Sequence, residues 1–206
     1  MKNGITLRRI LDDVRNYSYA KISRLCLINR KDLQNIQKEF RLSNEEKLHE
    51  NDAISVRLWV EKMADSEDNP VLYFKEQGKR DNNSFLAISD FQIVLMSKFQ
   101  LKMLKEFVYE KICIDSTHGT NTYDFSLTTL LTVDEFGAGF SMSFCVSNRT
   151  DARAMKNFFD CIKEKSGIIN TKVFMSDDAP AYFNAWQLSM GSAKHHLLCT
   201  WYVDRR

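Results

Sequence analysis

The chain has 206 residues, of which 44% are hydrophobic and 12% aromatic, and its formal net charge is +2 at pH 7. It contains only two prolines, and this composition can bury enough apolar surface to form a core, which excludes a disordered chain. No apolar stretch approaches the ~20 residues that a transmembrane helix needs, and the N-terminus lacks the apolar core of a signal peptide, so we expect no membrane partner.

The cysteines are odd in number, widely spaced and mostly set in apolar surroundings. This pattern favours buried free thiols over a disulfide framework and predicts a reducing, intracellular compartment. The five residues are Cys26, Cys113, Cys145, Cys161 and Cys199.

Positive charge is concentrated at the N-terminus, where residues 1–31 hold eight Lys or Arg against two Asp. Lysine and arginine attract phosphate by releasing counterions, so this segment is the expected DNA contact. Four of its basic residues are the candidates, namely Arg8, Arg9, Lys21 and Arg24. The alternative is an exposed helix face that carries ordinary solubilising charge.

The first half of the chain is predicted to be mainly helical. Apolar residues recur at three- and four-residue steps over residues 6–28 and again from Arg30 to Phe40, a helix pair found in helix-turn-helix DNA readers and equally in plain bundles. A helix over residues 53–63 and a short strand at residues 71–75 follow. Ser89-Asp90 is expected to cap a helix that continues to Phe107. We therefore predict a helical N-terminal region over residues 1–106.

From Lys111 the pattern changes to strands, and residues 107–206 are predicted to form a second domain. The strands are expected at residues 112–116, 126–133, 139–147, 172–176 and 195–201, with helices from Thr150-Asp151 to Gly167 and at residues 179–190. Three strands joined by hairpins, then helix, strand, helix and strand, is the order of an RNase H-like fold. The sequence thus predicts an α/β domain with a mixed five-stranded sheet and flanking helices.

Two aspartates stand where predicted strands end. Ile112, Cys113 and Ile114 lead into Asp115, and a similar apolar run leads into Asp177, 62 positions later. A right-handed crossover should place the first and fourth strands side by side, so the two carboxylates should meet at one end of the sheet. Without further information, carboxylates that merely end strands or cap loops are an equal alternative.

Three segments resemble Mutator-like (MULE) transposases, which use an Asp-Asp-Glu catalytic set on an RNase H-like fold. They are DSTHGTNTYDFSLTTLLTVDEFGAGFSMSFCVSNRTD at 115–151, FMSDDAPAYFNAW at 174–186 and LLCTWYVDRR at 197–206. The resemblance implies that Asp115 and Asp177 are the first two catalytic aspartates, because Ala185 lies eight positions after Asp177 as the family's alanine does. Asp178 is then expected to point away from the site, since adjacent strand residues face opposite sides.

The implied activity is metal-dependent DNA strand cleavage and transfer in the nucleus. Asp115 and Asp177 would hold Mg²⁺ or Mn²⁺, because these ions prefer hard oxygen ligands, and two such ions ~3.5–4 Å apart can stabilise both the attacking and the leaving oxygen. DNA is the expected partner, and a homo-oligomer is compatible with the resemblance.

Other candidates have an equally plain structural interpretation. Thr117, His118 and Asn121 either touch phosphate or make ordinary turn hydrogen bonds. Cys199 begins a stretch in which the family has Cys-x-x-His, but Tyr202 takes the place of the histidine. A zinc site would then need Cys199 with His195 and His196 in a different geometry. Trp186 and Trp201 are expected in the core.

The departures from the family pattern predict an inactive chain. No Cys/His cluster precedes Lys111, and after Asp177 the sequence has no Glu, so only Asp178 and Asp204 could serve as the third carboxylate. We expect a transposon-derived fragment that does not catalyse transposition. The alternatives are a domesticated, non-catalytic module that binds DNA or a protein, and an inert remnant.

Overall fold

A computed structural model describes residues 7–17, 28–39, 47–82, 84–133 and 137–199. The chain divides into two compact units, Met1–Trp59 and Val60–Arg206. In the first unit, α1 (Leu7–Tyr17) contacts α2 (Arg30–Glu39), which gives the predicted helix pair. The predicted continuation of the first helix over residues 18–27 lies outside the described residues. The predicted helix at residues 53–63 is also confirmed, as α3 (Asp52–Ala64), which crosses the boundary between the units.

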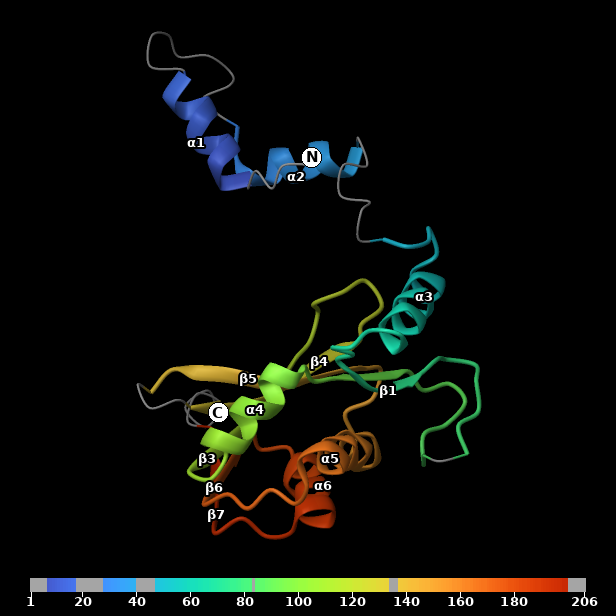
Figure 1. The fold of residues 1–206 in the computed structure, drawn as a ribbon, viewed down its shortest axis with the longest axis vertical. Coiled ribbons are helices and arrows are strands. Elements are labelled where there is room, and N and C mark those ends of the chain that lie inside the picture. Colours follow the sequence, from blue (N-terminus) through green and yellow to red (C-terminus); the bar gives the residue numbers. More distant parts are fainter. Residues whose placement is uncertain (1–6, 18–27, 40–46, 83, 134–136, 200–206) are drawn as a thin grey trace. The chain divides into compact units, whose positions relative to one another are not determined.

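The second unit is built on one mixed sheet of seven strands, in the order β1-β2-β5-β4-β3-β6-β7 (Figure 1). The strands are β1 (Val71–Lys75), β2 (Gln92–Leu95), β3 (Lys111–Thr117), β4 (Ser126–Val133), β5 (Gly139–Ser147), β6 (Val173–Ser176) and β7 (His195–Leu198). The pairs β3–β6 and β6–β7 are parallel, and the other neighbours are antiparallel. The mixed α/β fold class is confirmed, and the five strands predicted from residue 111 onward are present as β3 to β7. The sheet is larger than predicted, because β1 and β2 extend it to seven strands.

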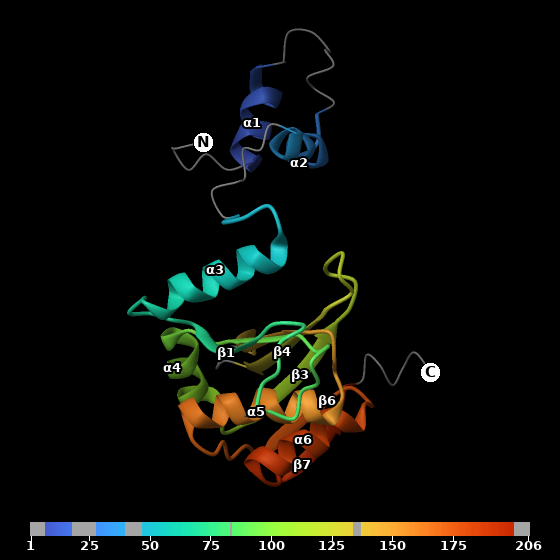
Figure 2. The ribbon, with the colours of Figure 1, turned by 90° about the vertical axis from the view of Figure 1, so that its right-hand side faces the viewer.

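Three helices pack on one face of this sheet: α4 (Lys98–Phe107), α5 (Ala152–Ser166) and α6 (Pro180–Met190) (Figure 2). Their apolar sides bury the large aromatic residues of the core. Phe159 and Trp186 meet edge to face with ring centroids 5.3 Å apart, and Phe174 of β6 lies 4.9 Å from Trp186. Trp186 is therefore a core residue, as predicted, and the prediction for Trp201 falls outside the described residues.

β2 corrects the prediction of a continuous helix from Ser89-Asp90 to Phe107. Gln92–Leu95 instead pairs with β1 and β5. Gln92 contacts α5, and Val94 belongs to the core beneath the helices. The side chain of Gln92 is fully buried and donates to the carbonyl of Ala154 at 2.9 Å. A helix at this position would leave that amide without its partner.

The helix that follows begins later and has its own cap. Ser97 accepts the backbone N–H of Gln100, and Gln100 returns a side-chain acceptor to the backbone N–H of Ser97. α5 begins as predicted, with Asp151 as its N-cap and Gly167 after its last turn at φ 79°. Positive φ at that position favours glycine, which has no Cβ to clash.

The described cysteines are free thiols, as predicted, and Cys26 lies outside the described residues. Burial raises the pKa of Cys145 and of Cys161 to about 12, so both are protonated at neutral pH. Among the helices of the described ranges, none combines the length and apolar character that crossing a bilayer requires.

Candidate functional site

The two aspartates singled out in the sequence lie at the same end of two neighbouring parallel strands. β3 and β6 pair as Lys111 with Val173 and Cys113 with Met175, a constant offset of 62 positions. Asp115 and Asp177 are separated by the same 62 positions, so extending the register by two residues sets them opposite each other. Asp115 is in β3, and Asp177 follows the last residue of β6.

The alternation of burial puts both aspartates on the same face of the sheet. Ile112, Ile114 and Ser116 are buried under the helices, whereas Asp115 is half-buried on the opposite face. Phe174 and Ser176 are likewise buried, so the period of two turns Asp177 the same way as Asp115. Asp178 is the next residue and is exposed.

Asp177 also has a structural role at the start of α6. Its Oδ1 accepts the backbone N–H of Ala179 at 3.0 Å, just before the helix begins at Pro180. An ionised carboxylate has about four lone-pair sites on two oxygens, so this bond leaves acceptor capacity for a cation. Asp177 thus caps a loop, which is one of the two interpretations of its position in the sequence. This role does not exclude that Asp177 is also a metal ligand.

Tyr182, in the first turn of α6, is a buried residue that reaches the end of β3. The side chain is buried, and this burial raises the pKa of Tyr182, while a hydrogen bond with Ser116 acts in the opposite direction. The negative charges of Asp177 and Asp115 raise the pKa of Tyr182 further. Sequence analysis missed Tyr182; the signal available was its position in the first turn of a helix that starts three residues after Asp177.

Beneath the aspartates, a short chain of hydroxyl groups ties three elements together. Ser116 Oγ of β3 lies 2.5 Å from Thr128 Oγ1 of β4, and Tyr182 of α6 contacts the same serine. These groups are buried and mutually satisfied. The end of β3 that carries Asp115 is therefore held on both sides by hydrogen bonds.

The loop after β3 is stabilised by its own polar side chains. Asn121 Oδ1 accepts the N–H groups of Tyr123 and Phe125, and its amide donates to the Phe125 carbonyl at 2.6 Å. His118 Nδ1 lies 3.0 Å from Ser126 Oγ. Asn121 and His118 thus make turn hydrogen bonds, and Thr117 ends β3 with an exposed side chain.

The histidines of β7 do not form the alternative zinc set. His195 pairs with Val173 and His196 with Phe174, so the two rings face opposite sides of the sheet. His196 stacks on Phe183 with centroids 3.9 Å apart, and burial lowers its pKa. Within the described ranges, no group of three His, Cys, Asp or Glu is close enough to hold a metal. Cys199 instead continues β7 beside β6, where its N–H donates to Ser176.

Two carboxylates on one face at one strand end fit Mg²⁺ or Mn²⁺, since Mg²⁺ is commonly held by one or two carboxylates and completes its shell with waters and substrate phosphates. The half-burial of Asp115 and Asp177 keeps them accessible to such a ligand. The two carboxylates therefore fit the divalent ion that the sequence predicts. In the described residues, they do not form a cluster of three His, Cys, Asp or Glu side chains.

The basic candidates of the N-terminal segment are only partly within the described residues. Arg8 and Arg9 are exposed on α1, while Lys21 and Arg24 lie outside the described ranges. Exposure is necessary for phosphate contact but does not distinguish it from a solvated surface. Their DNA contact stays a prediction.

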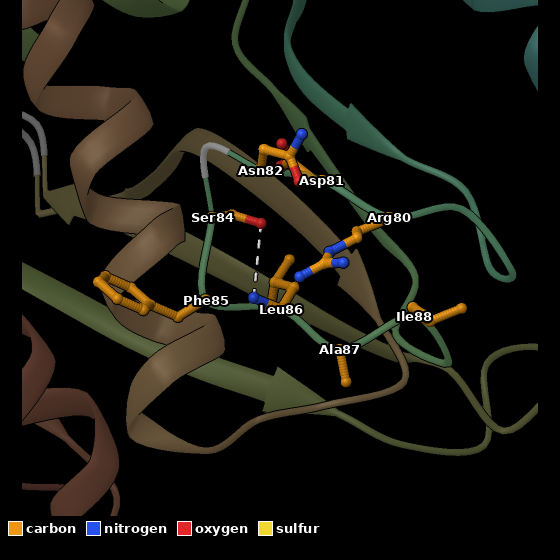
Figure 3. A pocket seen from close by; sticks show the side chains of 8 residues that line it. All are labelled: Arg80, Asp81, Asn82, Ser84, Phe85, Leu86, Ala87 and Ile88. Carbon is orange, nitrogen blue, oxygen red and sulfur yellow. Dashed lines mark hydrogen bonds between the residues drawn. The ribbon is translucent and has the colours of Figure 1, made fainter.

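A cavity of about 550 Å³ lies in the loop between β1 and β2, at the same sheet end as Asp115 but three strands away (Figure 3). The described residues that line it come from this loop, with Arg80, Asp81, Asn82 and Ser84 as polar members and Leu86 among the apolar ones. Asp81 accepts the hydroxyl of Tyr73 at 2.5 Å. The cavity contains neither aspartate of the candidate site.

Comparison with known proteins gives one family. The family model described as Zinc finger SWIM domain-containing protein 1/3, RNaseH-like domain, matches residues 70–188. Among curated proteins, none matches the chain. The matched range runs from just before β1 to near the end of α6, so it contains both Asp115 and Asp177 and the strands that bring them together. Because the match covers more than half of its length, the chain belongs to the RNaseH-like domain family of zinc finger SWIM domain-containing proteins 1 and 3.

Proposed function

We propose that the chain carries the two-carboxylate metal site of a Mutator-like DNA transposase, formed by Asp115 and Asp177, and that it binds DNA there without cutting it. The observation that supports this most is the shared offset of 62 between the β3–β6 register and the two aspartates. Chance placement of two strand-end carboxylates would not require them to match in register, in face and in strand end.

The chain's own residues would bind and orient the ion and the phosphodiester. Asp115 and Asp177 are the ligands, and the hydrogen bond from Ala179 fixes the rotamer of Asp177. The Tyr182–Ser116–Thr128 contacts hold the end of β3 in place, which keeps Asp115 in position for a ligand. When bound, a divalent ion supplies Lewis-acid polarisation of a phosphoryl oxygen and lowers the pKa of its water.

Cleavage is not expected, because the described residues bring only two carboxylates together and transposase chemistry of the Asp-Asp-Glu type uses three. With incomplete coordination, positioning and charge stabilisation are both reduced, at a cost of several kcal/mol in the barrier. Binding of metal and phosphate needs fewer ligands than cleavage does. The two activities should therefore separate in this chain.

An alternative function is a non-catalytic DNA- or protein-binding module, in which the aspartates have only structural roles. The hydrogen bond from Ala179 to Asp177 favours it, since capping alone is a reason to have an aspartate at this position. Neither proposal includes cleavage. In this alternative the bound partner is DNA or a protein, and metal would not change binding.

The test compares residues 1–206 with the Asp115→Asn/Asp177→Asn double variant on supercoiled and linear duplex DNA. We expect Mg²⁺ or Mn²⁺ to strengthen duplex binding by the unmodified chain and not by the variant, with no nicks from either. Metal-independent binding that is equal for both proteins would favour the non-catalytic module. Nicking that requires both aspartates would refute the claim of inactivity, and Asp204 would then be the first residue to test as a third ligand.

A further inference from the structure

The outward face of α4 carries three lysines in one row. Lys98, Lys102 and Lys105 follow the i, i+4, i+7 spacing that places side chains on successive turns of the same helix face. All three are exposed. Among the described residues, no carboxylate forms an ion pair with any of them. We call this row the α4 lysine stripe.

The positive surface continues past the end of α4. Over residues 98–111 together with Lys172, five lysines stand against two glutamates, a local charge of +3. One of these glutamates, Glu110, is already paired with Lys172 at 2.7 Å. The other, Glu106, makes no ion pair with the stripe in the described part of the chain, so the three lysines keep a net positive charge.

The aromatic side chains beside the stripe are engaged by neighbours. Phe99 packs edge to face on Phe140 with centroids 5.8 Å apart, and the Lys172 ammonium lies 4.8 Å above the ring of Tyr109. Stacking of an unpaired base on either ring would disturb these contacts. The surface thus offers lysine ammonium groups for phosphate rather than platforms for bases.

The stripe lies at the opposite end of the sheet from the aspartates. α4 leads into Lys111, the first residue of β3, whereas Asp115 is four residues further along this strand, about 13 Å away. The buried side of α4 is anchored by Leu104 in the core, so the lysines have a rigid base. Phosphate bound at the stripe would be separate from phosphate bound at Asp115 and Asp177.

We propose that the α4 lysine stripe is a docking surface for the phosphate backbone of duplex DNA. Its charge is complementary to a polyphosphate, and lysine is depleted at protein–protein interfaces, which argues against an acidic protein as the occupant. Because the contacts would reach phosphate and not base edges, binding is independent of sequence. The choice of DNA as the polyanion rests on the proposed function, while the geometry of the stripe does not.

The test measures binding of a 20-base-pair duplex at several salt concentrations in EDTA, so that the metal site contributes nothing. The Lys98→Gln/Lys102→Gln/Lys105→Gln variant is compared with a control that removes three other exposed lysines, Lys62→Gln/Lys165→Gln/Lys194→Gln. Loss of three phosphate contacts should reduce the slope of log K against log salt by about 2.7 in the stripe variant. The control variant should retain nearly the slope of the unmodified chain.

Three results would overturn the proposal. The first is an unchanged slope in the stripe variant, and the second is an equal reduction in both variants. The third is competition by polyglutamate as effective as that by DNA of the same charge, which would indicate an acidic protein partner. Circular dichroism of all three proteins establishes that they are equally folded. Because EDTA removes divalent metal from the assay, a negative result would not contradict the proposed function of Asp115 and Asp177, which has its own test.

Discussion

Tyr73 of β1 is half-buried, and its hydroxyl makes two hydrogen bonds. Its hydroxyl donates to the Asp81 carboxylate at 2.5 Å and lies 3.0 Å from Ser84 Oγ. Burial, and then the hydrogen bond with Asp81, raise the pKa of Tyr73 above its ordinary value of 10.0. The folded state therefore favours the neutral phenol more than the unfolded state does.

A raised folded-state pKa has a defined effect on the pH dependence of stability. The contribution of Tyr73 to the free energy of unfolding is fully present below pH 10 and is lost as pH rises from there toward the folded-state pKa. We expect Tyr73→Phe to lower stability at pH 7 but to flatten the decline above pH 10, measured by urea unfolding at pH 7 to 11. Exposed Tyr123 gives the matched control, Tyr123→Phe. A parallel decline in Tyr73→Phe and the unmodified chain would contradict this account.

At the residue scale, the sequence predicted Asp115 and Asp177 but could not predict Tyr182. An apolar run that ends in an acidic residue is a local pattern, and it is visible without the fold. The role of Tyr182 depends on α6 folding back so that its first turn reaches Ser116. Such a contact between distant segments leaves no periodic signal in the sequence.

At the scale of elements, the strands with strong alternation were predicted closely. Residues 126–133 and 139–147 are strands over the predicted ranges, because runs rich in β-branched and apolar residues lie there between turn signals. β2 was missed since its four residues join an apolar pattern that also fits a helix. Burial of Gln92 against α5, a tertiary contact, selects the strand.

The predicted helix start at Ser89-Asp90 and the observed start at Ser97 allow two serines to be compared as N-caps. Ser97 is the N-cap of α4 and forms a capping box with Gln100, whereas Ser89, which the sequence favoured as the cap, lies in the loop before β2. We expect Ser97→Ala to reduce the free energy of unfolding by about 0.5–2 kcal/mol. Ser89→Ala should change it by less than about 0.5 kcal/mol, the usual range for surface substitutions. If Ser89→Ala reduced the free energy of unfolding more than Ser97→Ala, the assignment of Ser97 as the cap would be wrong.

At the scale of the whole sheet, the two ends of β3 differ in charge. Asp115, Asp177 and Asp178 lie at the end where β3 and β6 finish, while Lys111 and Lys172 lie where these strands begin. This arrangement follows from parallel pairing, which sets like ends of β3 and β6 together. The acidic end is the candidate for metal, and the basic end extends toward the α4 lysine stripe.

The central claim is that Asp115 and Asp177 together form one divalent-cation site, and a titration with Mn²⁺ tests it most directly. Free Mn²⁺ is followed by electron paramagnetic resonance in the presence of the 206-residue chain, without DNA. Asp177→Asn is a sharp variant because its amide oxygen can still accept the Ala179 N–H while the charge is lost. Asp178→Asn is the matched control, since it removes a neighbouring exposed carboxylate.

We predict that the unmodified chain and Asp178→Asn bind Mn²⁺ alike, and that Asp115→Asn and Asp177→Asn each lose this binding while remaining folded by circular dichroism. Loss in both single variants is expected because one carboxylate with waters holds a divalent ion far more weakly than two. Mn²⁺ binding that is the same in all four proteins, or that is lost equally in Asp178→Asn, would contradict the claim.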